Sequence, residues 1–151
     1  MKSLPLVIFI AVVLFEAHKL LVSGEEKQRS CNSIVQEVTK MQLGGIATCT
    51  KSMKFKNGKE KSKKMNCILR CVMINVGILD LEGQVVADRV DEFLHKFFPD
   101  YLIERANKTF NPCLEMGVET KFKTLDEDQF CMTYDPFIKC LMGNIPNLCP
   151  K

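Results

Sequence analysis

Residues 65–77 read MNCILRCVMINVG, and this stretch decides the fold. Apolar side chains occupy most of the helical surface here, which is typical of a helix at the centre of a domain. Cys67 and Cys71 are four residues apart, so both lie on one side of the helix and can link it to two neighbours. Gly77 suits a helix C-terminus. The stretch therefore predicts a central helix in a disulfide-linked helical domain.

Eight cysteines follow an apolar leader: Cys31, Cys49, Cys67, Cys71, Cys113, Cys131, Cys140 and Cys149. Lys2, an apolar stretch over residues 4–15 and small residues up to Gly24 predict a signal peptide over residues 1–24, with cleavage after Ala17 as the alternative. This apolar stretch is shorter than the roughly 20 residues of a membrane span. We expect residues 25–151 to form one soluble, secreted domain, without a transmembrane segment and with all cysteines paired.

Zinc binding is the alternative role for Cys67 and Cys71. A zinc site needs two more thiols or imidazoles at matching spacing. Beyond the leader, the chain has one histidine, His95, and no Cys-x-x-Cys unit. We therefore expect structural disulfides, no metal and no cofactor.

Apolar periodicity predicts the remaining helices. The expected ranges are 33–49, 64–76, 86–98, 101–116 with a kink or break at Pro112, and a last helix that starts near Asp135-Pro136. In the first range, Gly44-Gly45 is expected to weaken the middle of the helix or to end it early. No alternating strand pattern is present. The fold class is therefore an all-α bundle of five to six short helices, cross-linked by disulfides.

A lysine-rich connector joins the first two of these ranges. Residues 51–64 contain seven lysines and one acid, Glu60. We expect a solvated loop leading into a short helix. The alternative is a surface for anionic lipid or a sulfated polymer.

The cysteine spacing resembles that of the insect odorant-binding proteins. Cys67-x3-Cys71, then 41 residues and Cys113, is similar to the centre of that family, and GILDLEGQV at residues 77–85 resembles the turn after its paired-cysteine helix. The ending with Cys140, eight residues and Cys149-Pro150 resembles the Plus-C subgroup. Two features depart from the family: the gap of 17 residues before Cys67 is short, and the tail after Cys149 is only two residues.

The resemblance implies an interlocked disulfide pairing. With Cys140 and Cys149 as the final common pair, the bridges are Cys49–Cys71, Cys67–Cys140 and Cys113–Cys149, and Cys31 and Cys131 form the fourth. A second registration takes Cys131-x8-Cys140 as the final pair, and the extra bridge is then Cys31–Cys149. We prefer the first registration, because Pro136 disfavours a continuous helix between Cys131 and Cys140.

The resemblance also implies a carrier that binds small hydrophobic ligands, such as odorants or pheromones, and transports them through sensillum lymph. Cross-linked helices cannot collapse fully, and pockets between bundle helices bind ligands. The candidate ligand-binding residues, each of which could equally be plain core, are Met73, Val76, Phe93, Phe97, Phe110, Leu114, Tyr134 and Phe137. Tyr101 and Tyr134 are candidates for a polar contact. An odorant receptor and a second copy of the chain are the candidate protein partners.

Other functions receive less support. The net charge of +3, about +2 without the leader, does not favour a nucleic-acid partner. A secreted phospholipase needs a His-Asp pair and a glycine-rich calcium loop. This sequence contains neither, so we expect no enzyme. A signalling or toxin-like protein, or the same carrier in saliva, venom or reproductive fluid, is the alternative. His95 is a candidate pH sensor or a plain surface residue, and Asn107 begins a glycosylation sequon.

Overall fold

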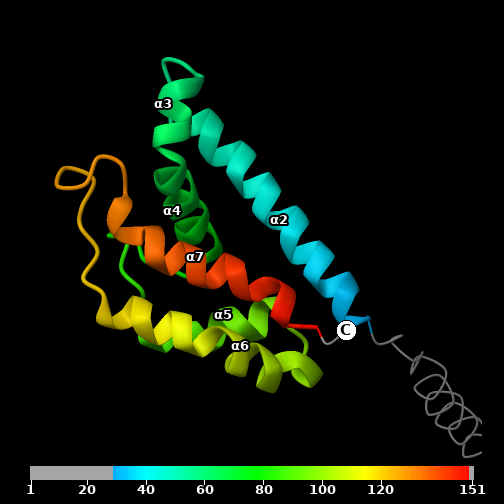
Figure 1. Cartoon of the computed structure of the whole chain (residues 1–151). Helices are drawn as coiled ribbons and strands as arrows, with labels where there is room; N and C mark the ends of the chain where they lie inside the picture. The colour runs from blue at the N-terminus through cyan, green and yellow to red at the C-terminus, as the bar shows by residue number, and fades with distance from the viewer. Residues whose placement is uncertain (1–28, 150–151) are drawn as a thin grey trace, which may run out of the picture. The chain divides into compact units, whose positions relative to one another are not determined.

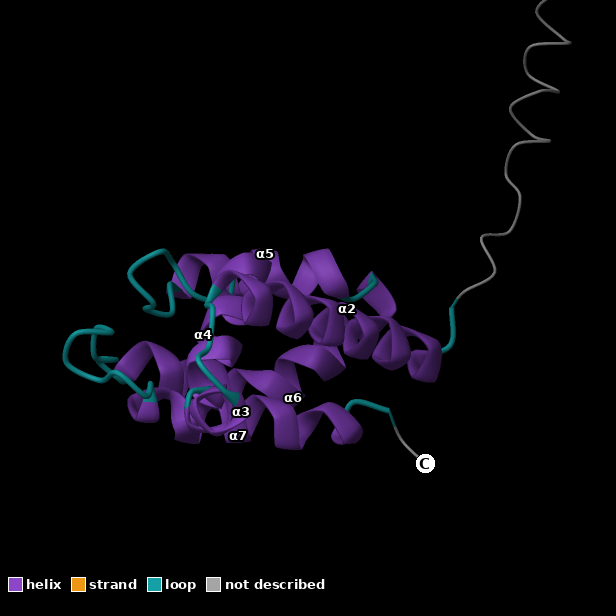
Figure 2. Ribbon diagram, turned by 90° about the horizontal axis from the view of Figure 1, so that it is seen from above, coloured by secondary structure: helices purple, strands orange, loops and turns teal. Residues whose placement is uncertain are grey.

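The computed structural model describes residues 29–149, and the predicted signal peptide lies outside this range. The described chain consists of helices joined by loops (Figures 1 and 2). The elements are α2 (Cys31–Ser52), α3 (Gly58–Lys63), α4 (Met65–Val76), α5 (Ala87–Phe97), α6 (Asp100–Glu119), the short 3₁₀ turn η1 (Met132–Tyr134), α7 (Asp135–Asn144) and the 3₁₀ turn η2 (Ile145–Asn147). A single isolated β-bridge joins Leu79 and Val85 within these residues. The predicted all-α fold class is confirmed.

The central helix α4 has the predicted end. Gly77 has a left-handed backbone (φ +90°), and its N–H donates to the Ile74 carbonyl at 3.1 Å. Glycine adopts this conformation without the steric cost that a Cβ would bring. The residues of α4 that are buried include Cys67, Ile68 and Val72, as a central helix requires.

Two helices are longer than the sequence predicted. α2 continues through Gly44-Gly45 as far as Ser52. α6 is one helix that contains Pro112, so of the kink or break expected there, the break does not occur. Pro112 and Lys108 are both exposed. Water can therefore satisfy the Lys108 carbonyl, which loses its intrahelical N–H donor at the proline.

The larger of two cores joins α4, α5, α6 and α7 and includes Ile34 of α2, and the smaller one joins the C-terminal half of α2 to α4. Tyr134 and Phe137 are fully buried in the larger core, where Phe122 stacks on Tyr134 with ring centroids 4.4 Å apart. Cys49, Ile68 and Val72 form the smaller core. α2 thus packs on the domain mainly through α4.

All eight cysteines are paired, and the pairing corrects three predicted bridges. The bridges are Cys31–Cys149, Cys49–Cys71, Cys67–Cys131 and Cys113–Cys140. Cys49–Cys71 is confirmed, whereas Cys67–Cys140, Cys113–Cys149 and Cys31–Cys131 are wrong. The second registration is the one observed.

The position of Pro136 explains this correction. Cys131 precedes η1, and α7 begins only at Asp135. No continuous helix joins Cys131 to Cys140, and Pro136 occupies the first turn of α7, where a helix tolerates proline. Pro136 therefore does not disfavour the second registration.

Candidate functional site

A cavity of about 170 Å³ lies between α2, α4, α5, α6 and α7. Its walls carry no ionisable side chain, and Thr39 and Gln42 are the polar residues among them. The lining residues are Val38, Thr39, Met41, Gln42, Leu43, Ile46, Leu69, Val72, Met73, Val76, Ile78, Phe93, Phe97, Phe98, Phe110, Leu114, Ile138, Leu141, Met142 and Ile145. This lining suits a hydrophobic molecule and lacks the groups for acid–base chemistry.

Helical spacing places these side chains on common faces. α5 contributes Phe93 and Phe97, and α6 contributes Phe110 and Leu114, in each case four residues apart. Residues at this spacing lie on one face of a helix, one turn apart. Aromatic rings gather at this wall: Phe93 and Phe97 lie 4.7 Å apart between ring centroids.

The structure brings six of the eight predicted ligand-binding residues to the cavity: Met73, Val76, Phe93, Phe97, Phe110 and Leu114. Tyr134 and Phe137 lie elsewhere, in the larger core. Tyr101 is also outside the lining. Periodicity identified the apolar faces, but it could not show which faces meet a cavity and which meet other side chains.

The hydroxyl of Tyr134 has a structural role instead. It donates to the Gly83 carbonyl at 3.0 Å and accepts a hydrogen bond from Nε of Arg70 at 2.9 Å. The Arg70 guanidinium also donates to the Glu82 carbonyl at 3.1 Å. These bonds hold the turn that follows α4 against η1.

The sequence did not predict that α2 forms a wall of the cavity. The helical stripe that includes Val38, Met41 and Ile46 was visible in the sequence, yet it gave no sign that this stripe covers a cavity. The Thr39 hydroxyl donates to the Val35 carbonyl at 2.8 Å. Within the described residues the Gln42 amide has no hydrogen-bond partner, so Gln42 is a lining residue with unpaired polar atoms.

Exposed apolar side chains mark the mouth of the cavity. Met41 and Leu43 of α2 are 37% and 61% exposed, and Met142 of α7 is 43% exposed, although all three line the cavity. We call these three residues the rim. A ligand can therefore reach the cavity between α2 and α7.

The titratable groups with shifted pKa values lie outside the cavity. The backbone N–H of Lys56 lowers the pKa of Glu60, and the backbone and hydroxyl of Thr124 lower that of Glu127. A hydrogen bond from Lys139 lowers the pKa of Asp135. These carboxylates are surface groups that stabilise local structure.

The other predicted site features lie apart from the lining as well. The His95 imidazole is 3.7 Å from an Asp91 carboxylate oxygen and 3.9 Å from one of Asp100. Asn107 is partly exposed on α6. Among residues 29–149, no group of three or more His, Cys, Asp or Glu side chains is arranged to hold a metal ion.

The family model of the PBP/GOBP family matches residues 24–144. The chain belongs to this family, the insect pheromone-binding and general odorant-binding proteins. Searches of curated proteins and of solved structures return no significant match. The Plus-C subgroup is not confirmed, and the observed pairing differs from the registration on which it rested.

Family membership supports the coarse features of the predicted function. PBP/GOBP proteins are binding proteins rather than enzymes, and they are typically secreted carriers of small hydrophobic molecules. No helix in the described part of the chain combines the length and the apolarity that crossing a bilayer requires.

Proposed function

We propose that this PBP/GOBP protein is a secreted carrier that binds a small hydrophobic molecule in the cavity between α2 and α7. The observation that carries this proposal is a void of about 170 Å³ without an ionisable side chain in its wall. Apolar cavities of roughly 150 Å³ stay dry and bind benzene-sized molecules. The enclosed part of the ligand is therefore about the size of one ring or a short branched hydrocarbon.

Affinity sets a lower limit on the size of the whole ligand. Ten buried carbons contribute about 8 kcal/mol at about 0.8 kcal/mol each, and association costs at least about 4 kcal/mol. The remaining 4 kcal/mol or so corresponds to about millimolar binding. Sixteen carbons contribute about 13 kcal/mol and can reach micromolar affinity, but they exceed the enclosed space.

We therefore propose that the ligand has a compact apolar body inside the cavity and a remainder at the mouth. The rim of Met41, Leu43 and Met142 would cover this remainder, and methionine adapts to varied ligand shapes. Gln42 would donate a hydrogen bond to an oxygen of the ligand, such as that of an alcohol, aldehyde or ester.

Filling the cavity tests the proposal. Val76→Phe adds a ring at a lining position, and Val118→Phe makes the same change at an exposed position of α6 outside the cavity. In a titration with phenylnaphthylamine, whose fluorescence rises in apolar surroundings, we expect Val76→Phe to weaken binding at least tenfold. Val118→Phe should bind like the parent. Equal affinity for all three proteins would refute the cavity as the ligand site.

Gln42→Leu tests the polar contact separately. A hydrogen bond contributes about 1 kcal/mol, so this variant should lose about fivefold in affinity for an alcohol. Its affinity for a hydrocarbon with the same number of carbons should not fall. Equal losses for both ligands would show that Gln42 acts only through packing.

A further inference from the structure

The described chain separates its charge strongly. Residues 51–64, which we call the basic tip, carry seven lysines and one glutamate, a net charge of +6. The rest of the described chain has ten basic and fourteen acidic residues, a net charge of −4. In Figure 1 the tip comprises the C-terminal end of α2, the following turn and α3. The net charge of the chain is therefore small although positive charge is concentrated at the basic tip.

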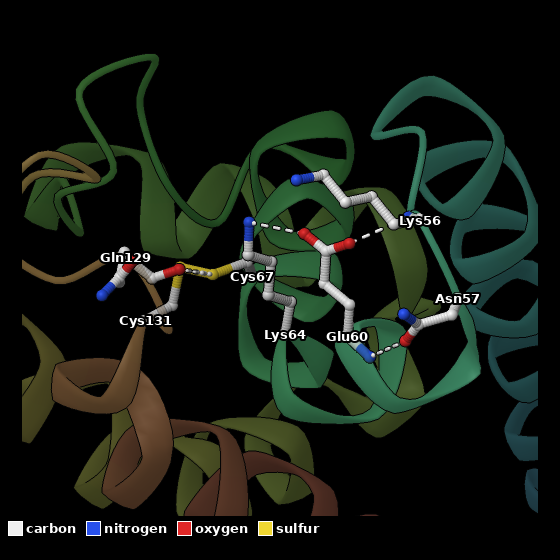
Figure 3. A network of polar contacts seen from close by, with 7 residues as sticks. All are labelled: Lys56, Asn57, Glu60, Lys64, Cys67, Gln129 and Cys131. Carbon is white, nitrogen blue, oxygen red and sulfur yellow. Dashed lines mark hydrogen bonds and ion pairs between the residues drawn. A yellow bond between two sulfur atoms is a disulfide. The ribbon is translucent and has the colours of Figure 1, made fainter.

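The glutamate of the tip is used to hold its shape (Figure 3). Glu60 accepts a hydrogen bond from the Lys56 N–H at 2.8 Å, and its other oxygen lies 3.4 Å from the Lys64 ammonium. Asn57 caps α3 by accepting from the Glu60 N–H at 2.9 Å. The Cys49–Cys71 and Cys67–Cys131 bridges tie the neighbouring chain down on either side. The lysines are thus presented on a fixed frame.

Most of the lysines have no partner of their own. Five of the seven are exposed: Lys51, Lys54, Lys56, Lys59 and Lys63. Within the described residues, Lys64 is the one lysine of the tip that forms an ion pair. Several like charges on one frame repel one another, and a polyanion relieves this repulsion. We propose that the basic tip binds a sulfated polysaccharide, an interaction separate from the ligand cavity.

Two observations favour a sulfated polysaccharide over an anionic membrane. First, the four disulfides indicate an oxidising compartment outside the cytosol, whereas anionic lipids concentrate in the cytoplasmic leaflet. Second, the apolar side chains of the tip, Met53 and Phe55, pack against the smaller core. The tip therefore offers charge without an apolar anchor for a bilayer.

Heparin, as a probe, tests this proposal on the full mature chain. The tip variant is Lys51→Gln, Lys59→Gln and Lys63→Gln. The control variant, Lys40→Gln, Lys121→Gln and Lys123→Gln, removes the same charge from exposed positions outside the tip. At low salt we expect the affinity of the tip variant for heparin to be at least about tenfold lower than that of the parent. Each exposed ion pair with heparin is weak, but the variant loses three of them at once. The control should stay within about twofold, and parent binding should fall steeply with added salt.

Three results would overturn the proposal: no heparin binding by the parent at low salt, equal losses in both variants, or binding only to phosphatidylserine vesicles. The second would reveal a dependence on net charge alone, and the third a membrane surface. Phenylnaphthylamine titration of the same proteins keeps the two functions distinguishable. Both triple variants should bind the dye like the parent, whatever the heparin result.

Discussion

Removing the bridge between Cys31 and Cys149 tests how the mouth of the cavity is held. α2 is covalently fixed at both ends, through Cys31–Cys149 and Cys49–Cys71. Between these anchors, Ile34 is its one buried side chain. α7 and η2 form the side of the cavity mouth opposite α2, which we call the lip, and Cys149 lies two residues after the end of η2. We expect the double variant Cys31→Ser/Cys149→Ser to let α2 separate from that lip and to speed ligand exchange.

The loss of stability follows from the connectivity of the bridges. Without the Cys31–Cys149 bridge, the shortest covalent path from Cys31 to Cys149 passes through the other disulfides. It follows the chain for 18 residues to Cys49, passes through the disulfide to Cys71 and follows the chain for four residues to Cys67. It then passes through the disulfide to Cys131 and follows the chain for 18 residues to Cys149. The bridge therefore closes a ring of about 40 residues rather than one of the full sequence separation, 118. The chain-entropy relation then gives about 4 kcal/mol. For about 120 ordered residues this corresponds to a fall in Tm of about 15 °C.

The Cys67–Cys131 bridge provides a matched control, because it closes the same ring. Cys67→Ala/Cys131→Ala should cost at least as much stability, since both cysteines are buried. This control variant should leave α2 packed beside α7 at the mouth of the cavity. Calorimetry gives the two Tm values, and stopped-flow dilution of bound phenylnaphthylamine, below both transitions, gives the dissociation rates. We expect the dissociation rate of the dye to rise about tenfold or more for Cys31→Ser/Cys149→Ser, equivalent to about 1.4 kcal/mol. The dissociation rate of the control variant should change little.

Equal acceleration in both variants would refute the reasoning, because general destabilisation would then explain the exchange. An unchanged Tm without the Cys31–Cys149 bridge would refute the ring argument independently.

Three further substitutions probe the frame around the cavity. Tyr134→Phe should lower the free energy of unfolding by about 1–3 kcal/mol, because the Gly83 carbonyl and Arg70 lose a buried partner, while dye affinity stays unchanged. Gly83→Ala should lower Tm measurably, since φ is +89° and the new Cβ would meet the Tyr134 hydroxyl and Arg70; a parent-like Tm would contradict the structure. Burial raises the pKa of Asp128, but hydrogen bonds, chiefly from Thr133, outweigh this and hold the pKa below its usual 3.8. The resulting stabilisation is present above the unfolded-state pKa of about 4 and is lost as the pH falls through the lower folded-state pKa. Asp128→Asn should therefore lower Tm at pH 7, and this Tm difference from the parent should shrink as the pH falls. A Tm difference that does not shrink on acidification would argue against this role.

Local signals in the sequence were sufficient for the helices. The apolar surface of residues 65–76 and the glycine at 77 predicted α4 and its end correctly. The sequence was less informative at Gly44-Gly45, where glycine propensity favoured a weak or broken helix. In the structure, a Cβ at Gly45 would lie 3.1 Å from Val72 of α4. This glycine permits close packing of α2 on α4 near the Cys49–Cys71 bridge, which is a tertiary reason that local propensity cannot reveal.

Long-range features were predicted less well, because equal spacings allow different partners. Eight residues separate both Cys131 from Cys140 and Cys140 from Cys149, so spacing alone could not select a registration. The start of α7 at Asp135 decided it. In the same way, helical spacing identified Phe97 and Phe137 as inward-facing residues. Only the packing of neighbouring helices places Phe97 at the cavity and Phe137 in the solid core.

The cavity and the bridges are linked energetically. A void of 170 Å³ costs about 4 kcal/mol at about 24 cal/mol per Å³, because its walls lose contacts that a filled core would make. One bridge that closes a ring of about 40 residues contributes about the same amount. Cys31–Cys149 closes that ring between α2 and the segment after α7, the two sides of the mouth. The bridge therefore offsets the cost of an empty cavity at the place where α2 would otherwise move. A carrier of the proposed kind needs this, because it must stay folded both before it takes up its ligand and after it releases it.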